Sequence, residues 1–258
     1  MSIITQSIPS VFTLGNLFMG MLSMINAMEG TEEGFVRAAW FIVAAAIFDT
    51  LDGKASRILN SASKFGVELD SIVDACSFGI APALLTYQYM LTYLPAWNTF
   101  AFPIAFIFAA CVTLRLARFN VQLVGFSKSS FTGMPSPMGA GLVATFVAFA
   151  NTDIMANIAA EHVFPYVVII AAALMVSSVK YDTMPKLSWS GAYNRFKLVV
   201  LFGFIGLAIF YPAEVFFPMG VVYMSFGLVR SAIHLFRSED VDEYEESLDA
   251  DESEEAIV

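Results

Sequence analysis

Long apolar stretches set the strongest limit on how this chain can fold. A bilayer core of about 30 Å needs about 20 mostly apolar residues for each helix that crosses it. The sequence contains eight stretches of roughly this length, at about 8–28, 35–57, 67–93, 99–120, 138–159, 163–180, 197–212 and 215–235. We therefore expect an all-α integral membrane protein, built as a polytopic bundle of about eight transmembrane helices.

The composition excludes a single water-soluble domain. Of the 258 residues, 58% are hydrophobic and only 14% are charged. Soluble domains have about 45–50% apolar and about 25% charged residues. The same comparison excludes a disordered or fibrous chain. We expect membrane lipid to surround the protein, and we expect no nucleic-acid partner.

The positions of the basic residues predict the orientation of the helices. Twelve of the 13 Lys and Arg residues fall in connections on one side of an eight-helix bundle, and Arg37 is the exception. The connections on the other side carry acidic residues instead, among them Glu29, Glu32 and Glu33. By the positive-inside rule, the basic side and both termini are cytoplasmic. We expect the protein to lie in the cell membrane.

The net charge of −10 belongs to the C-terminal tail. Residues 238–258 contain eleven Asp or Glu and no Lys or Arg, which leaves 13 basic against 12 acidic residues in the rest of the chain. A block of like charges stays solvated and does not form a packed core. We therefore expect a transmembrane domain over 1–237 and an acidic, disordered cytoplasmic tail over 238–258.

Four aspartates fall within 26 residues of two adjacent predicted spans: Asp49, Asp52, Asp70 and Asp74. Ionisable residues in a membrane span are costly and by default mark a functional site. The first two are three residues apart and the last two are four apart, so each pair shares one face of its helix. Because a short connection makes the two helices antiparallel neighbours, we expect the four acids to converge near the cytoplasmic side.

Four carboxylates at close quarters repel one another, and bound divalent cations resolve this repulsion. Oxygen ligands favour Mg²⁺ or Mn²⁺, and neither His162 nor His234 lies near the acids in the sequence, so zinc is disfavoured. Lys54, Arg57 and Lys64 add positive charge beside the acids, an arrangement that stabilises phosphoryl oxygens. These three residues could instead form a structural ion network with the acids, but the regular spacing of the acids disfavours that alternative.

The spacing of these acids, and of the small residues around them, resembles the signature of the CDP-alcohol phosphatidyltransferase family, D-x2-D-G-x2-A-R-x8-G-x3-D-x3-D. The matching residues are Asp49, Asp52, Gly53, Arg57, Gly66, Asp70 and Asp74. Ser56 stands where the family usually has Ala, a small-for-small change beside the nucleotide. The signature covers 26 residues, and the eight-span layout extends the resemblance to most of the membrane domain.

Residues around the signature resemble the phosphatidylserine synthase branch of that family. The runs concerned are 64–71 with Asp74, 77–83, 115–120 and 133–137, together with the N-terminal pattern Pro9-Ser10-x2-Thr13-x2-Asn16-Leu17. The resemblance implies transfer of a phosphatidyl group from CDP-diacylglycerol to L-serine, with release of CMP. It also implies a homodimer.

The resemblance further implies the roles of the site residues. Asp49, Asp52, Asp70 and Asp74 would bind the metal, expected as two Mg²⁺ or Mn²⁺ ions, and Asp74 would also act as the general base. The nucleotide and its pyrophosphate would be bound by Asp52, Gly53, Ser56, Arg57 and Gly66. A carboxylate near the serine hydroxyl is suited to take its proton during attack. The active site would then face the cytosol.

A second group of residues is a candidate site for the acceptor or for a lipid phosphate. Arg115 and Arg118 are three residues apart and could clamp a carboxylate or a phosphate with paired donors, and Asn120 follows them. Anchoring beside anionic headgroups is an equally simple role for both arginines.

The sequence leaves other functions open. One is the same chemistry with inositol phosphate or glycerol phosphate as acceptor, and another is an archaeal ether CDP-lipid as donor. A cation transporter is the more distant alternative, although transporters usually have paired repeats with broken helices near the midplane of the membrane.

Overall fold

The computed structural model describes residues 3–58, 63–124, 133–152, 154, 160–179, 206–229 and 231. Its helices are α1 (Ile3–Ala27), α2 (Glu32–Ile58), α3 (Lys64–Asp74), η1 (Ala75–Ile80), α4 (Ala81–Tyr93), η2 (Pro95–Trp97), α5 (Asn98–Val124), α6 (Ser136–Ala150) and α7 (Ala160–Val176). Further helical residues cover 206–210 and 212–229. The described residues contain no strand, which confirms the predicted all-α class.

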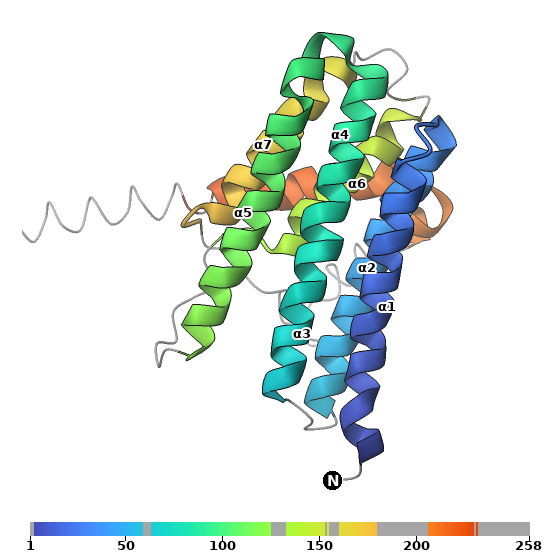
Figure 1. The fold of residues 1–258 in the computed structure, drawn as a ribbon. Coiled ribbons are helices and arrows are strands. Elements are labelled where there is room, and N and C mark those ends of the chain that lie inside the picture. The colour runs from blue at the N-terminus through green and yellow to red at the C-terminus, as the bar shows by residue number, and fades with distance from the viewer. Residues whose placement is uncertain are drawn as a thin grey trace, which may run out of the picture.

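Helices α1, α2, α3–α4 and α5 lie side by side and alternate in direction (Figure 1). The start of α1, the end of α2 and the start of α3 meet at the same end of the bundle (Figure 1). Helix α1 packs against α2, α3 and α4, while α6 packs on α2 and α7 packs on α5. The N-terminal half of α1 therefore lies beside both helices that carry the four aspartates.

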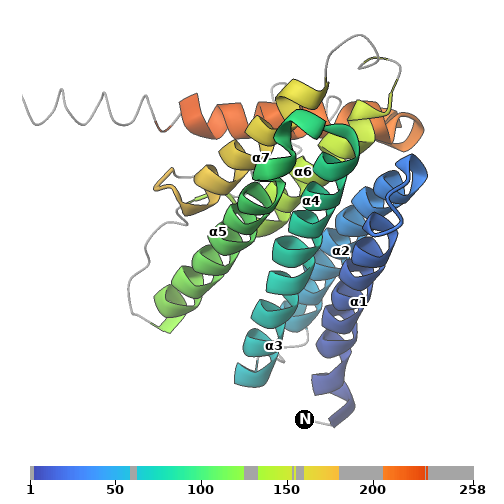
Figure 2. The same cartoon turned by 45° about the horizontal axis from the view of Figure 1, so that its top comes forward.

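Several of the expected spans exist as apolar helices, and five of those in the described residues are long enough to cross a membrane. Four long ones belong to the bundle, namely Ser10–Ala27, Glu32–Ile58, Phe65–Tyr93 and Pro95–Val121, and two shorter ones are Ser136–Ala150 and Val163–Val176. A fifth long helix, Pro212–Val229, corresponds to the last expected span. It runs across the bundle and not along it (Figures 1 and 2). Most of the expected span 197–212 lies outside the described residues.

Helix α1 has its polar side chains inside and its apolar side chains outside. Thr13, Asn16 and Ser23 are buried. The opposite face carries large apolar side chains that are more than half exposed: Val11, Leu14, Phe18, Met21 and Ile25. An amphipathic helix of a water-soluble protein has the reverse arrangement. This pattern is what a lipid-facing helix with a polar interior site requires.

The turn between α1 and α2 depends on two local features. Gly30 has a φ of 66°, a left-handed conformation that glycine adopts without the steric cost of a side chain. Thr31 precedes the first residue of α2, and its hydroxyl accepts a hydrogen bond from the backbone N–H of Gly34 at 3.1 Å. This N-cap satisfies one of the free donors of the helix end. Together they reverse the chain within a few residues.

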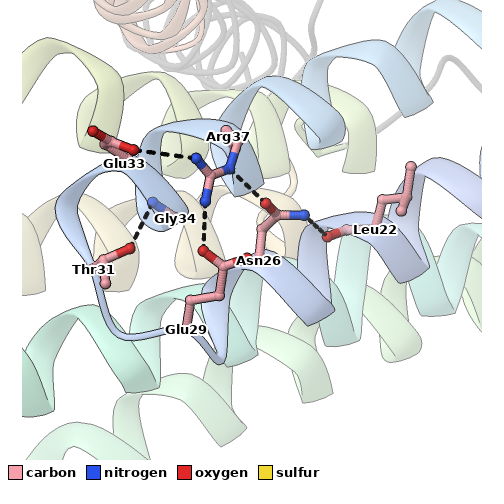
Figure 3. Close-up of polar contacts among 7 residues, drawn as sticks. All are labelled: Leu22, Asn26, Glu29, Thr31, Glu33, Gly34 and Arg37. Atoms are coloured by element: carbon pink, nitrogen blue, oxygen red, sulfur yellow. Dashed lines mark hydrogen bonds and ion pairs between the residues drawn. The ribbon is translucent and has the colours of Figure 1, made fainter.

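Arg37 joins α1 to α2 near this turn (Figure 3). Its guanidinium pairs with Glu29 at 2.5 Å and with Glu33 at 3.4 Å. Its Nε donates to the side-chain oxygen of Asn26 at 2.8 Å. Arg37 was the exception in the distribution of basic residues, and the structure gives it a local role: it is neutralised by two carboxylates on its own side of the bundle.

A wide helical turn separates α3 from α4. Residues Ala75–Ile80 form a π-helix, and the N–H of Ala81 bonds to the carbonyl of Cys76, five residues earlier. Pro82 follows, and a proline has no N–H and its ring crowds the carbonyl four residues before it. The widened turn accommodates this proline without a break in the span. It begins directly after Asp74 and leaves Ser77, Phe78 and Gly79 all buried.

The contact between α1 and this turn leaves no room for a side chain at Gly20. A Cβ atom there would lie 3.0 Å from the Cα of Ser77 and closer still to its hydroxyl. We expect Gly20→Ala to destabilise the protein by about 1–3 kcal/mol, the usual cost of overpacking. Gly141 in α6 has open space at the same position and is the matched control. Thermal unfolding in detergent checks this, and equal melting temperatures for the two variants would contradict it.

Candidate active site

Three of the four predicted aspartates meet between α2 and α3. Carboxylate oxygens of Asp49, Asp70 and Asp74 all lie within 4.8 Å of one another. Asp74 is 9% exposed, and the other two are half-buried. The helical spacing places Asp70 and Asp74 on one face of α3, and the antiparallel arrangement brings α2 against that face. The prediction that acids from the two helices converge is confirmed for these three residues.

Asp52 is placed beside α1 and does not belong to this group of three. Its side chain is buried, with 8% exposed, and its Oδ2 accepts a short hydrogen bond from the hydroxyl of Thr13. A buried carboxylate needs such a donor because it has left water. Thr13 therefore holds the fourth acid of the signature in position.

Asn16 makes the corresponding contact with Asp74. Its Nδ2 donates to Oδ1 of Asp74 at 3.1 Å. The hydroxyl of Ser77 in turn donates to the backbone carbonyl of Asn16 at 3.1 Å. Thr13 and Asn16 belong to the N-terminal pattern of the family resemblance, which implies no role for either residue. Their spacing of three residues places both on one face of α1, which indicates a polar face on this helix but does not identify its partners.

The residues predicted to bind the nucleotide lie near the C-terminal end of α2 and at the start of α3. A Cβ at Gly53 would meet only the guanidinium of Arg57, at 3.7 Å, so the space beside this glycine is open. The Nε of Arg57 donates to the carbonyl of Gly53 at 3.0 Å, and its side chain is exposed. Ser56 is half-buried. Gly66 donates its N–H to the hydroxyl of Ser63, the N-cap of α3, at 3.0 Å.

Arg115 has hydrogen-bond donors that could bind an anionic group. Its Nη1 donates to the hydroxyl of Ser136, the first residue of α6, at 2.7 Å. Its Nε is buried and has no hydrogen-bond partner among the described residues. A buried donor without a partner is rare in proteins and calls for an explanation. A bound carboxylate or phosphate would supply one.

Arg118 and Asn120 make contacts that join α5 to other helices. The guanidinium of Arg118 donates to backbone carbonyls at the end of α7, to Val176 at 3.1 Å, to Met175 at 3.4 Å and to Ser177 at 3.5 Å. A cation at that end of a helix is favourable because the last carbonyls are unpaired. Asn120 donates to the hydroxyl of Ser71 on α3 at 2.9 Å, next to Asp70 in the chain.

The donor set of the site fits a hard divalent cation. Every member of the group formed by Asp49, Asp70 and Asp74 is a carboxylate, and the described residues place no His or Cys with them. Opposite oxygens around Mg²⁺ are separated by about 4.2 Å, because each bond is about 2.1 Å long. A separation within 4.8 Å is close to this value. The side-chain oxygen of Asn16, beside Asp74, is buried and lacks a partner among the described residues.

A bundle of apolar helices with a cluster of carboxylates near one end defines an integral membrane protein with an acidic site of the kind that can hold a metal ion. The model of the CDP-alcohol phosphatidyltransferase family matches residues 6–179. The chain belongs to this family and is an enzyme of it. The family resemblance of the aspartate signature is thereby confirmed.

Curated relatives cover most of the chain. A CDP-diacylglycerol–serine O-phosphatidyltransferase of Helicobacter pylori strain J99 is 33% identical over 224 residues, which is 86% of this chain and 90% of that protein. Proteins with the same description are 35% identical over 164 residues in Methanocaldococcus jannaschii (64% of this chain, 73% of that protein) and 32% identical over 180 residues in Bacillus subtilis strain 168 (69% and 92%).

Proposed function

We propose that the protein transfers the phosphatidyl group of CDP-diacylglycerol to the hydroxyl of L-serine, forming phosphatidylserine and releasing CMP. The observation that carries the proposal is the meeting of Asp49, Asp70 and Asp74 between α2 and α3. The description of the relatives as serine phosphatidyltransferases supports serine as the acceptor. In this reaction a bond forms between the serine oxygen and the lipid phosphorus, and the phosphoanhydride bond to CMP breaks.

Asp74 is the proposed general base. A serine hydroxyl is a weak nucleophile at neutral pH, so it needs a carboxylate within hydrogen-bond reach to take its proton. Oδ1 of Asp74 accepts a hydrogen bond from Asn16, and its carboxylate faces those of Asp49 and Asp70. This leaves Oδ2 of Asp74 for the incoming hydroxyl or for a cation.

The nucleotide side of the site is proposed around the end of α2. Asp49, Asp52, Asp70 and Asp74 would hold the divalent ions, two of them on our proposal. Bound Mg²⁺ or Mn²⁺ would screen the phosphate oxygens and stabilise the charge on departing CMP. The open space at Gly53 allows close approach of the pyrophosphate, with Ser56, Arg57 and Gly66 beside it.

The acceptor side is proposed at Arg115. Its unpartnered Nε is suited to the carboxylate of serine, and Ser136 orients the guanidinium through Nη1. Arg118 and Asn120 would contribute by holding α7 and α3 against α5, because their side chains already bond to those helices. A role for either residue in direct contact with the acceptor would require these bonds to open.

The remaining proposals concern the surroundings of the site. We place the protein in the cell membrane with its transmembrane domain in residues 1–237, both termini and the active site on the cytoplasmic side, and 238–258 as an acidic cytoplasmic tail. The distribution of basic residues supports this orientation. A homodimer is proposed from the family resemblance.

A comparison of acceptors tests the proposed function. Purified protein with Mg²⁺ or Mn²⁺ and CDP-diacylglycerol is expected to release CMP with L-serine and to form lipid-linked serine. Inositol phosphate and glycerol phosphate are expected to give only the CMP release seen without acceptor. The reason is that the proposed acceptor side offers one cation, Arg115, to the phosphate group that these acceptors carry. CMP release measured with each acceptor identifies the acceptor alcohol. The same measurement with an ether CDP-lipid tests the alternative donor. Faster release with either phosphorylated acceptor would contradict the proposal.

A further inference from the structure

We propose that Asn16 is a positioning residue for Asp74, which it holds in one orientation from the neighbouring helix α1. The inference deepens the proposed function, because it depends on Asp74 acting in phosphatidyl transfer. It assigns a part in the reaction to a residue outside the aspartate signature.

The first support is the direct contact. The amide Nδ2 of Asn16 donates to Oδ1 of Asp74 at 3.1 Å, between α1 and α3. Asn16 is fully buried and Asp74 is 9% exposed, so water does not readily replace this bond. A single donor on one carboxylate oxygen limits rotation of the carboxylate and leaves the other oxygen in a defined direction. A base must present its free oxygen to the hydroxyl that it deprotonates.

The second support is that Asn16 is itself held. The hydroxyl of Ser77 donates to the backbone carbonyl of Asn16 at 3.1 Å. Gly20, one turn further along α1, allows the backbone of Ser77 to approach closely. The wide turn that begins after Asp74 brings Ser77 into this contact. Backbone and side chain of Asn16 are thus both tied to the segment that carries Asp74.

The third support is the orientation of the amide. The Oδ1 of Asn16 is buried and has no partner among the described residues. Turning the amide over would place this oxygen against Oδ1 of Asp74, and two acceptors repel each other. The contact with the carboxylate therefore determines the orientation of the amide.

The decisive variant is Asn16→Leu, which keeps the approximate size and removes the donor. We expect kcat to fall about 10- to 100-fold, as when an outer partner of a ligating side chain is lost. The affinity for CMP in the presence of Mn²⁺ is expected to stay within about twofold, because Asn16→Leu leaves all four carboxylates of the site in the protein. Ser23→Ala is the matched control: Ser23 is fully buried on the same helix and makes no hydrogen bond to the acids.

A double-mutant cycle separates positioning from a general effect on folding. If Asn16 acts through Asp74, Asn16→Leu is expected to cause no further loss of kcat in an Asp74→Asn background. Asn16→Ala is measured in parallel for the case in which leucine prevents folding, and melting temperatures in detergent identify folded variants. The acceptor in all assays is the one that the wild-type protein uses, so a wrong assignment of serine does not affect the comparison.

Two results would overturn the inference. One is a kcat of folded Asn16→Leu or Asn16→Ala protein equal to that of the Ser23→Ala control. The other is an equal loss of kcat from Asn16→Leu with and without Asp74. In both cases the proposed function stands if wild-type protein forms lipid-linked serine and Asp74→Asn does not.

Discussion

Asp74→Asn is expected to lower kcat by about 10²- to 10⁴-fold, the range in which loss of a general base falls. The variant keeps the size of the side chain, and its amide oxygen can still accept the hydrogen bond from Asn16. It cannot take a proton from the serine hydroxyl. Asp49, Asp52 and Asp70 remain, so binding of CMP in the presence of Mn²⁺ is expected to persist. Steady-state release of CMP and equilibrium binding of CMP measure the two quantities separately.

Glu68→Gln is the matched control for this prediction. Glu68 is an exposed acid on α3, two residues before Asp70, and does not belong to the group of three. Its loss changes the net charge of the helix by the same amount without touching the site. If Asp74→Asn turns over at the rate of Glu68→Gln, Asp74 is not the base.

Asp49→Asn is expected to abolish metal-dependent binding of the nucleotide. Asp49 supplies the α2 carboxylate of the cluster, and the other two members come from α3. Without it, a cation between the helices loses a charged ligand. The loss of an outer-shell partner lowers metal affinity about 10- to 100-fold. We expect the loss of Asp49 to lower the affinity for Mn²⁺ by more than this. Titration with Mn²⁺, followed by titration with CMP, measures the effect.

Removal of the metal from wild-type protein gives the corresponding result without a substitution. A chelator is expected to stop CMP release, and added Mg²⁺ or Mn²⁺ to restore it, while Asp49→Asn protein stays inactive at the same concentrations. Full activity in the presence of chelator would show that the three carboxylates do not work through a cation. Glu68→Gln again serves as the control, with an expected response equal to wild type.

Much of the fold follows from apolar length alone. The expected spans 8–28, 35–57 and 99–120 coincide with α1, α2 and α5, because about 20 apolar residues have few alternatives to a helix in lipid. The crossing direction of the helix 212–229 could not be predicted in this way. Its position depends on tertiary packing of Phe216 on Trp40 and of Phe217 on Phe146.

The candidate site was predictable as far as it depends on spacing within one helix. The periodicity places Asp70 and Asp74 on one face of α3, and the short connection places α2 beside it. The roles of Thr13 and Asn16 depend on which helix packs next to the acids, and spacing along a single helix does not contain that information. Arg118 illustrates the same limit: its contacts lie at the end of α7, far away in the sequence.

The two polar contacts of α1 also bear on the order in which the protein can mature. Thr13 and Asn16 are synthesised before Asp52 and Asp74, the residues that they bond. When the first hairpin enters the bilayer, Asn16 still lacks its carboxylate and Ser77 has not been made. The contacts of Asn16 with Asp74 and Ser77 therefore cannot form until the ribosome has synthesised the chain as far as Ser77.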